Sequence, residues 1–66
     1  MGKMNPENLY KLASNLAQQY GWISVSLFQR QYALGFSVAR TAILRLEAEG
    51  IVSQPDKQGA RALLNS

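Results

Sequence analysis

The chain has 66 residues and no cysteine, so its fold must rest on an apolar core. Neither a disulfide nor a thiolate-bound metal can add to its stability. A domain of about this size buries roughly 60% of the surface that its unfolded chain exposes, which makes its stability marginal. Because 47% of the residues are hydrophobic, we expect a globular core and not wholesale disorder. The sequence predicts a single domain over residues 1–66, with residues 1–5 flexible.

A first helix is predicted over residues 6–20. Asn5 is a favourable N-cap, Pro6 is tolerated at the first helical position, and the acid Glu7 suits the positive end of the helix dipole. Gly21 is a natural C-terminal stop. Between these signals, apolar residues recur at helical spacing. They are Leu9, Leu12, Ala13, Leu16, Ala17 and Tyr20.

Two further helices are predicted, over residues 26–33 and 37–49. Ser24 or Ser26 can cap the first of them, and Ser37 can cap the second. At about 100° per residue, the later helix has one apolar arc that must face the core. The inward arc contains Ala39, Ala42, Ile43 and Leu46. The outward arc contains Ser37, Thr41, Leu44 and Ala48, flanked by Arg40 and Arg45. The predicted core includes Leu12, Leu16, Phe28, Ile43, Leu46 and Val52.

A β-hairpin is predicted over residues 51–64. Residues 51–53 form a short strand, residues 55–59 supply turn chemistry, and residues 60–64 return as a second strand. A short extended segment begins at Trp22, before the second helix. The expected fold class is therefore mainly α with a small β-hairpin, a winged helix-turn-helix of three helices and a wing.

This order of elements indicates a DNA-binding protein. In a helix-turn-helix, the second helix of the motif enters the major groove, and a hairpin that follows it can contact the neighbouring backbone. The formal charge of +3 and the isoelectric point near 9.7 fit a nucleic-acid partner. We therefore expect double-stranded DNA as the partner. The candidate DNA-binding residues are Gln29 and Arg30 on the second helix, Ser37, Arg40, Thr41, Leu44 and Arg45 on the third, and Lys57 and Arg61 in the wing.

Within this set, the arginines of the third helix are predicted to contact bases. Arg40 and Arg45 flank the outward arc, and an arginine can pair with both acceptors of a guanine. Lys57 and Arg61 belong to the wing, where a phosphate contact is expected and carries no direct sequence information. Leu44 lies at the centre of the arc and could meet a thymine methyl group, a second subunit of a homodimer, or another protein.

From Ser24 onward, the residues resemble the gamma domain that closes FtsK/SpoIIIE-type DNA translocases. The resemblance runs without a gap over about two-thirds of the chain. The matching residues are Ser24, Ser26, Gln29, Arg30, Gly35, Phe36, Ala39, Ile43, Glu47, Gly50, Ile51, Val52, Gly59, Arg61 and Leu64. The first helix fits the family pattern more loosely.

The family resemblance implies a winged helix that recognises a short, directional DNA motif and contacts a tyrosine recombinase at the chromosome terminus. The groove-facing residues of this chain differ from the family pattern. Ser37 and Val38 stand where the family has Asn-Arg. Thr41 replaces a further arginine, and Leu44 replaces a glutamate. We therefore expect a DNA target other than the guanine-rich one of the translocases.

An enzyme is not expected. The chain has no histidine and no cysteine, it lacks a glycine-rich phosphate loop, and its four acids are scattered. We therefore predict no catalytic residue, no metal site and no cofactor. No apolar run approaches the ~20 residues that cross a bilayer, and no signal peptide is evident. The expected location is the cytoplasm, on nucleoid or plasmid DNA, without membrane association.

Three interpretations of the chain's role remain. The first is a sequence-specific DNA-binding protein that acts as a small regulator of transcription or as an accessory factor. The second is a protein-interaction module on a winged-helix scaffold, which Leu44, Val38 and the modest charge support. The third is the excised gamma domain of a translocase. Binding to random duplex DNA at varied salt separates the first two.

Overall fold

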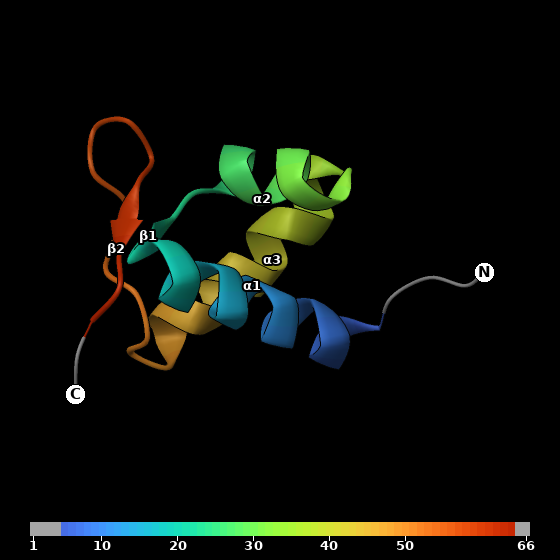
Figure 1. Ribbon diagram of the computed structural model, residues 1–66, viewed down its shortest axis with the longest axis horizontal. Helices are drawn as coiled ribbons and strands as arrows, with labels where there is room; N and C mark the ends of the chain where they lie inside the picture. Colours follow the sequence, from blue (N-terminus) through green and yellow to red (C-terminus); the bar gives the residue numbers. More distant parts are fainter. Residues whose placement is uncertain (1–4, 65–66) are drawn as a thin grey trace.

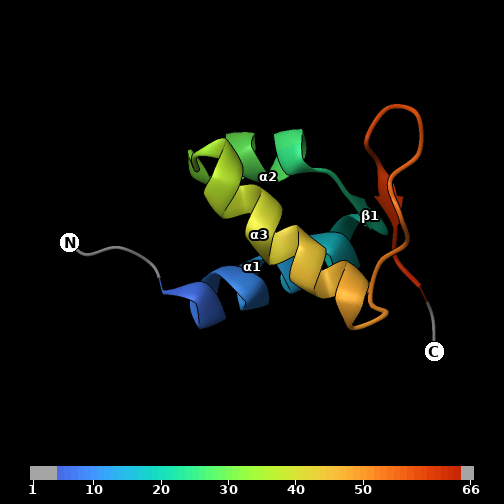
Figure 2. The same ribbon diagram turned by 180° about the vertical axis from the view of Figure 1, so that it is seen from behind.

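The computed structural model describes residues 5–64. It contains three helices, α1 (Pro6–Tyr20), α2 (Val25–Tyr32) and α3 (Phe36–Ala48), and two short strands, β1 (Trp22–Ile23) and β2 (Arg61–Ala62). Figures 1 and 2 show α3 packed between α1 and α2, with the strands at one end of the molecule and the wing loop beside them. The expected mainly α, winged-helix fold class is confirmed.

Local signals explain both ends of α1. The side-chain oxygen of Asn5 accepts a hydrogen bond of 2.8 Å from the amide of Asn8. At the other end, Gly21 adopts a left-handed conformation with φ of 80° and donates its amide to the carbonyl of Ala17. α1 therefore spans the expected residues 6–20. Residues 1–5 were expected to be flexible. Residues 1–4 lie outside the described part of the chain, whereas Asn5 is held as the N-cap of α1.

The second and third helices each begin and end one residue earlier than expected. Ser24, which is buried, accepts a hydrogen bond of 3.0 Å from the amide of Leu27 and so caps α2. The cap predicted at Ser37 is wrong. Gly35 is the N-cap of α3, with no side-chain capping bond, so Ser37 lies inside the first turn. This shift follows from the left-handed Ala33, which ends α2 and makes the interhelical turn short.

The core lies where the three helices and β1 meet. The apolar arc predicted for α3 is confirmed, because all four of its inward residues are buried. Among the predicted core residues, Leu12 is only half-buried and packs against the core from its edge. The buried apolar residues are Leu9, Ala13, Leu16, Ala17, Ile23, Phe28, Ala39, Ala42, Ile43, Leu46 and Val52.

The β-structure is smaller than expected and includes β1. β2 pairs antiparallel with β1, so that Ile23 lies opposite Arg61. On the other side, the expected strand over residues 51–53 is reduced to a single bridge between Val52 and Leu63. The ladder stops at Ser53, whose hydroxyl, in place of a main-chain carbonyl, accepts the amide of Ala62. Beyond this point the chain diverges into the wing loop.

The wing loop is closed by an aspartate. The carboxylate of Asp56 accepts hydrogen bonds from the amides of Gln58 and Ala60, at 2.8 and 2.9 Å. Gly59 has a φ of 86°, which favours glycine at this position of the turn. Asp56 therefore holds the loop that presents Lys57. Separately, none of the described helices is long and apolar enough to cross a bilayer.

Candidate nucleic-acid interface

The helix-turn-helix formed by α2 and α3 leaves the outward face of α3 uncovered. Figure 2 shows α3 running across this face of the molecule. Ser37, Arg40 and Thr41 are exposed, and Leu44 is half-buried. Four of the five residues proposed on this helix therefore lie on or beside a face that a major groove could receive. Arg45 is the exception.

Arg45 is bonded to α1 and to the end of its own helix. Its guanidinium donates to the carboxylate of Glu7 at 3.1 Å and to that of Glu49 at 3.2 Å. The same guanidinium lies over the ring of Tyr10, 3.9 Å from its centre, at a distance that gives a cation–π attraction. This arrangement argues against the base contact predicted for Arg45, because a contact with DNA would compete with three partners within the protein.

Tyr10 and Glu49 complete this cluster. The hydroxyl of Tyr10 donates a hydrogen bond to the carboxylate of Glu49. This bond, followed by the one from Arg45, lowers the pKa of the Glu49 carboxyl. The same bond to Glu49 raises the pKa of the Tyr10 hydroxyl. We call Glu7, Tyr10, Arg45 and Glu49 the α1–α3 clamp, because they fasten the C-terminal half of α3 to the first helix.

Arg61 is also bonded within the fold. Its side chain is 8% exposed and forms an ion pair with Glu47 of α3, whose side chain is 30% exposed. The Arg61 Nε atom has no hydrogen-bond partner among the described residues. The sequence placed Arg61 in the wing as a phosphate contact. The structure corrects this placement, because β2 pairs with β1 and turns Arg61 inward, where it joins the end of the chain to α3.

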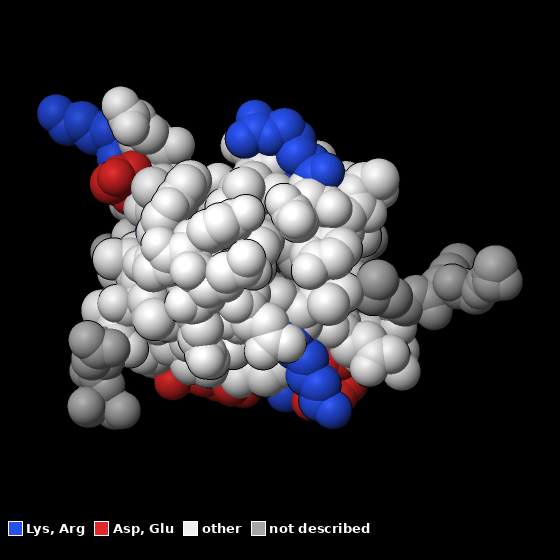
Figure 3. Space-filling model, viewed as in Figure 1, with Lys and Arg blue, Asp and Glu red and all other residues white. Residues whose placement is uncertain are grey.

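The remaining basic residues of the described part, residues 5–64, form no ion pair within it. They are Lys11 on α1, Arg30 on α2, Arg40 on α3 and Lys57 in the wing, and all four are exposed. Figure 3 shows basic side chains along the edge formed by α2, a basic and an acidic side chain next to each other at the wing, and acidic and basic side chains together at the opposite edge. Because Asp56 is adjacent to Lys57 in the wing, the unbalanced positive charge of the described residues is concentrated on the helix-turn-helix, at Arg30 and Arg40.

Gln29 contributes less to this surface than the sequence predicted. It is half-buried, and its side-chain amide makes a long hydrogen bond of 3.4 Å to the carbonyl of Leu34. This bond directs the amide toward the turn between α2 and α3. Of the two α2 candidates, Arg30 is the one that the structure leaves exposed.

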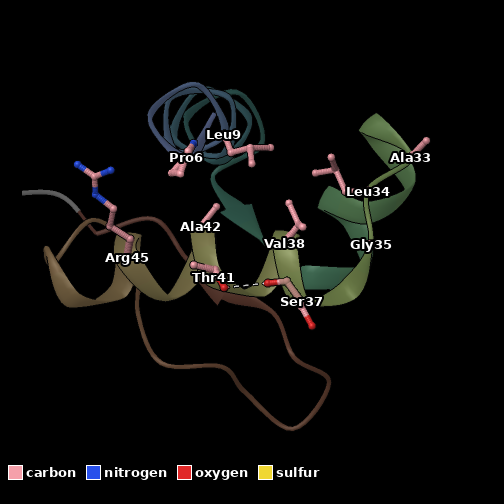
Figure 4. A pocket seen from close by; sticks show the side chains of 10 residues that line it. All are labelled: Pro6, Leu9, Ala33, Leu34, Gly35, Ser37, Val38, Thr41, Ala42 and Arg45. Carbon is pink, nitrogen blue, oxygen red and sulfur yellow. Dashed lines mark hydrogen bonds between the residues drawn. The ribbon is translucent and has the colours of Figure 1, made fainter. Parts of the chain in front are cut away.

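A groove of 590 Å³ lies beside the outward face of α3. Figure 4 shows Pro6 and Leu9 of α1 along one side and Val38 and Thr41 of α3 along the other. Arg45 stands at one end, and the α2–α3 turn closes the other. Val38 and Phe36 are not among the DNA-binding residues predicted from the sequence, although Val38 was given as support for a protein-interaction role. They are 45% and 57% exposed, although both are apolar. Both residues lie in the first turn of α3, before the inward arc begins at Ala39. This position could have indicated from the sequence that they are exposed.

The fold and the placement of charge define a small winged-helix domain with one basic edge. Comparison with known proteins then gives its family. The model of the Ftsk gamma domain matches residues 5–66. The chain belongs to the FtsK gamma domain family, as the resemblance in its sequence indicated.

Relatives of the chain include much longer proteins that carry the name DNA translocase FtsK. The protein of Rickettsia bellii is 36% identical over 58 residues, that of Campylobacter jejuni 33% over 58, and that of Haemophilus ducreyi 43% over 44. The alignments cover 88%, 88% and 67% of this chain. The chain spans only 8%, 6% and 5% of the length of these relatives.

Proposed function

We propose that this chain binds duplex DNA, with α3 in the major groove and with α2 and the wing on the backbone. One observation carries the proposal. Arg30, Arg40 and Lys57 are exposed on these three elements and form no ion pair within residues 5–64. Three of the four carboxylates are paired with Arg45 or Arg61, and the fourth, Asp56, lies next to Lys57 and accepts amides of the wing turn. The name of the relatives, DNA translocase, supports the same partner.

We further propose that the domain binds specific sequences and is a binding module without catalytic activity of its own. Its role would be that of a small regulator or accessory factor, or of the DNA-binding part of a translocase. A position on the nucleoid follows from either role. The family resemblance adds a tyrosine recombinase as a protein partner. The departures at Ser37, Val38, Thr41 and Leu44 support a DNA target of its own.

The test is binding to a random-sequence duplex at several salt concentrations. Two phosphate contacts, from Arg30 and Lys57, give a log–log salt slope of about −1.8 per bound chain, at about 0.9 per contact. Arg30→Ala and Lys57→Ala should each flatten the slope by about 0.9. Lys11→Ala is the matched control, since Lys11 is an exposed cation on α1, outside the helix-turn-helix and the wing. Absence of binding at low salt would contradict the proposal.

A second candidate function is protein binding through the groove between α1 and α3. Its support is the apolar lining, to which Leu9, Leu34 and Val38 contribute, together with the exposure of Val38. A second copy of the chain is one such partner. A Pro6→Asp variant, on the α1 side of the groove, that loses self-association or partner binding while its affinity for random duplex is retained would favour this function.

A further inference from the structure

The base contacts open to α3 follow from the side chains that it carries. In the major groove, a guanine is recognised by arginine or lysine, an adenine by asparagine or glutamine, and a cytosine amino group by a carboxylate. The thymine methyl group is recognised by apolar contact. Residues 36–48 contain no asparagine, glutamine or lysine. The helix therefore has no side chain that can pair with both polar atoms of an adenine.

The charged side chains of α3 further limit the bases that the helix can contact. Arg45 belongs to the α1–α3 clamp, and Glu47 is paired with Arg61. Neither is available to a base without breaking an interaction that holds the fold together. Arg40 is exposed and is the one charged side chain of α3 that forms no ion pair within the described residues. The helix can therefore contact one guanine through a charged group.

The hydroxyl of Thr41 is already used. It donates a hydrogen bond of 2.8 Å to the main-chain carbonyl of Ser37 (Figure 4). A threonine hydroxyl has one proton, so Thr41 has no hydrogen-bond donor left for a base. Its oxygen can still accept a hydrogen bond, and its γ-methyl group offers an apolar contact. Val38, one turn earlier on the same side of the helix, is apolar and 45% exposed, and Phe36, at the start of the helix, is 57% exposed. The N-terminal half of the helix, which lies closest to the bases in this class of motif, thus presents mostly methyl and aromatic groups.

We infer that α3 recognises its DNA site mainly through thymine methyl groups, with Arg40 supplying a single guanine contact. This inference rests on the proposed binding of duplex DNA and names its target class, a site rich in A·T pairs around one G·C pair. Thr41 and Val38 are the residues that contact the methyl groups. Ser37, whose hydroxyl can bond either kind of base pair, adds little discrimination.

The test replaces thymine by uracil, which lacks only the methyl group. A site is first selected from a random duplex pool, and each thymine is then replaced singly. Loss of one buried methyl contact should weaken binding by about fourfold, and two or three positions should show this loss. Uracil outside the selected site is the matched DNA control. Thr41→Ser is the matched protein variant, because it removes the γ-methyl and keeps the hydroxyl that bonds Ser37.

The variant and the uracil substitution should not be additive. At the position that Thr41 contacts, the penalty for uracil should vanish in Thr41→Ser and persist at the other positions. If uracil does not weaken binding at any position of the selected site, the inference is overturned, but the proposed binding of duplex DNA is not. A selected site that requires two or more guanines would also overturn it. Absence of binding to any duplex would overturn both.

Discussion

The guanidinium of Arg45 lies 3.9 Å from the centre of the Tyr10 ring, and both side chains bond the carboxylate of Glu49. A cation on the helix-turn-helix is thereby held by the first helix. The clamp has two consequences. It removes one arginine from the DNA-binding surface, and it makes the contact between α1 and α3 depend on two titrating groups, the Glu49 carboxyl and the Tyr10 hydroxyl.

The contribution of the clamp to stability should be confined to a window of pH. The pKa of Glu49 is lowered by Tyr10 and Arg45, so its contribution is present above the ordinary value of about 4.3 and is lost as pH falls through the lowered value. The pKa of Tyr10 is raised by Glu49, so its contribution is present below about 10 and is lost as pH rises through the raised value.

We therefore predict that Glu49→Gln lowers the Tm most between about pH 5 and 10. The difference in Tm should vanish at the acid end of the range and shrink at the alkaline end, where the ion pair between Arg45 and Glu49 remains. Thermal unfolding of both from about pH 3 to 11 measures this difference. Glu7→Gln is the matched control, because it removes one ion pair of Arg45 and leaves the bond between Tyr10 and Glu49 in place. A difference that is constant across the whole range would contradict the prediction.

The core prediction concerns Leu46, which is fully buried on the inward arc of α3. Leu46→Ala should lower the free energy of unfolding by about 2–5 kcal/mol, through lost burial and the cavity left behind. In a domain this small, that loss threatens the native state. Leu44→Ala, at a half-buried position of the same helix, should cost less. Urea unfolding measures both variants, and an unchanged midpoint for Leu46→Ala would show that the helix is oriented differently.

Much of the fold could be predicted from the sequence because the residues that define its helices act locally. Asn5, Gly21 and Ser24 lie at helix ends and carry the capping chemistry that those ends need. The inward arc of α3 follows from the 3.6-residue period alone. The cap predicted at Ser37 was wrong because glycine is also accepted at an N-cap, and Gly35 takes that position two residues earlier. The prediction of a strand over residues 51–53 was wrong because β2 pairs with β1 instead. Pairing between segments so far apart in the sequence cannot be predicted from local signals.

The site could be predicted less well from the sequence, because it depends on contacts between residues that are far apart along the chain. Arg45 and Glu7 are 38 positions apart, and Arg45 and Tyr10 meet only once α1 has packed on α3. Likewise, β2 pairs with β1, and this turns Arg61 toward Glu47. A charge count treats every arginine as equal. The folded structure divides them into those bonded within the protein and those left for a partner.

The ion pair of Arg61 gives a third prediction. Glu47→Ala removes the partner of a guanidinium that is 8% exposed. Breaking a fully buried pair in this way costs about 3–5 kcal/mol. We expect about 3 kcal/mol, the lower end of that range, because the Glu47 side chain is 30% exposed. Arg61→Met should cost less, since it leaves no buried cation. Urea unfolding measures the free energy of unfolding of both variants. A larger loss in Arg61→Met than in Glu47→Ala would contradict the prediction and would mean that the ion pair stabilises the fold by more than its desolvation costs.

The fourth prediction separates the two arginines of α3, which the sequence treated alike. Arg40 is exposed and forms no ion pair within residues 5–64, whereas Arg45 is clamped to α1. Arg40→Ala should relax the preference at one G·C pair of the selected site, where a good arginine–guanine contact contributes about 1–3 kcal/mol of discrimination. Arg45→Ala should lower the Tm and leave the preference among base pairs unchanged. Any change in the affinity of Arg45→Ala should be the same for all DNA sequences.

The measurement is binding of each variant to the selected site and to every single-base-pair variant of that site, at one salt concentration. Replacing the contacted guanine by 7-deazaguanine, which lacks the N7 acceptor, should weaken the wild type and leave Arg40→Ala unaffected. A loss of preference in Arg45→Ala would mean that the clamp opens on DNA and releases its arginine to a base. In that case the bond between Tyr10 and Glu49 should change on binding. The Tyr10 ring resonances, compared in the free and DNA-bound protein, would then shift in the wild type and not in Arg45→Ala.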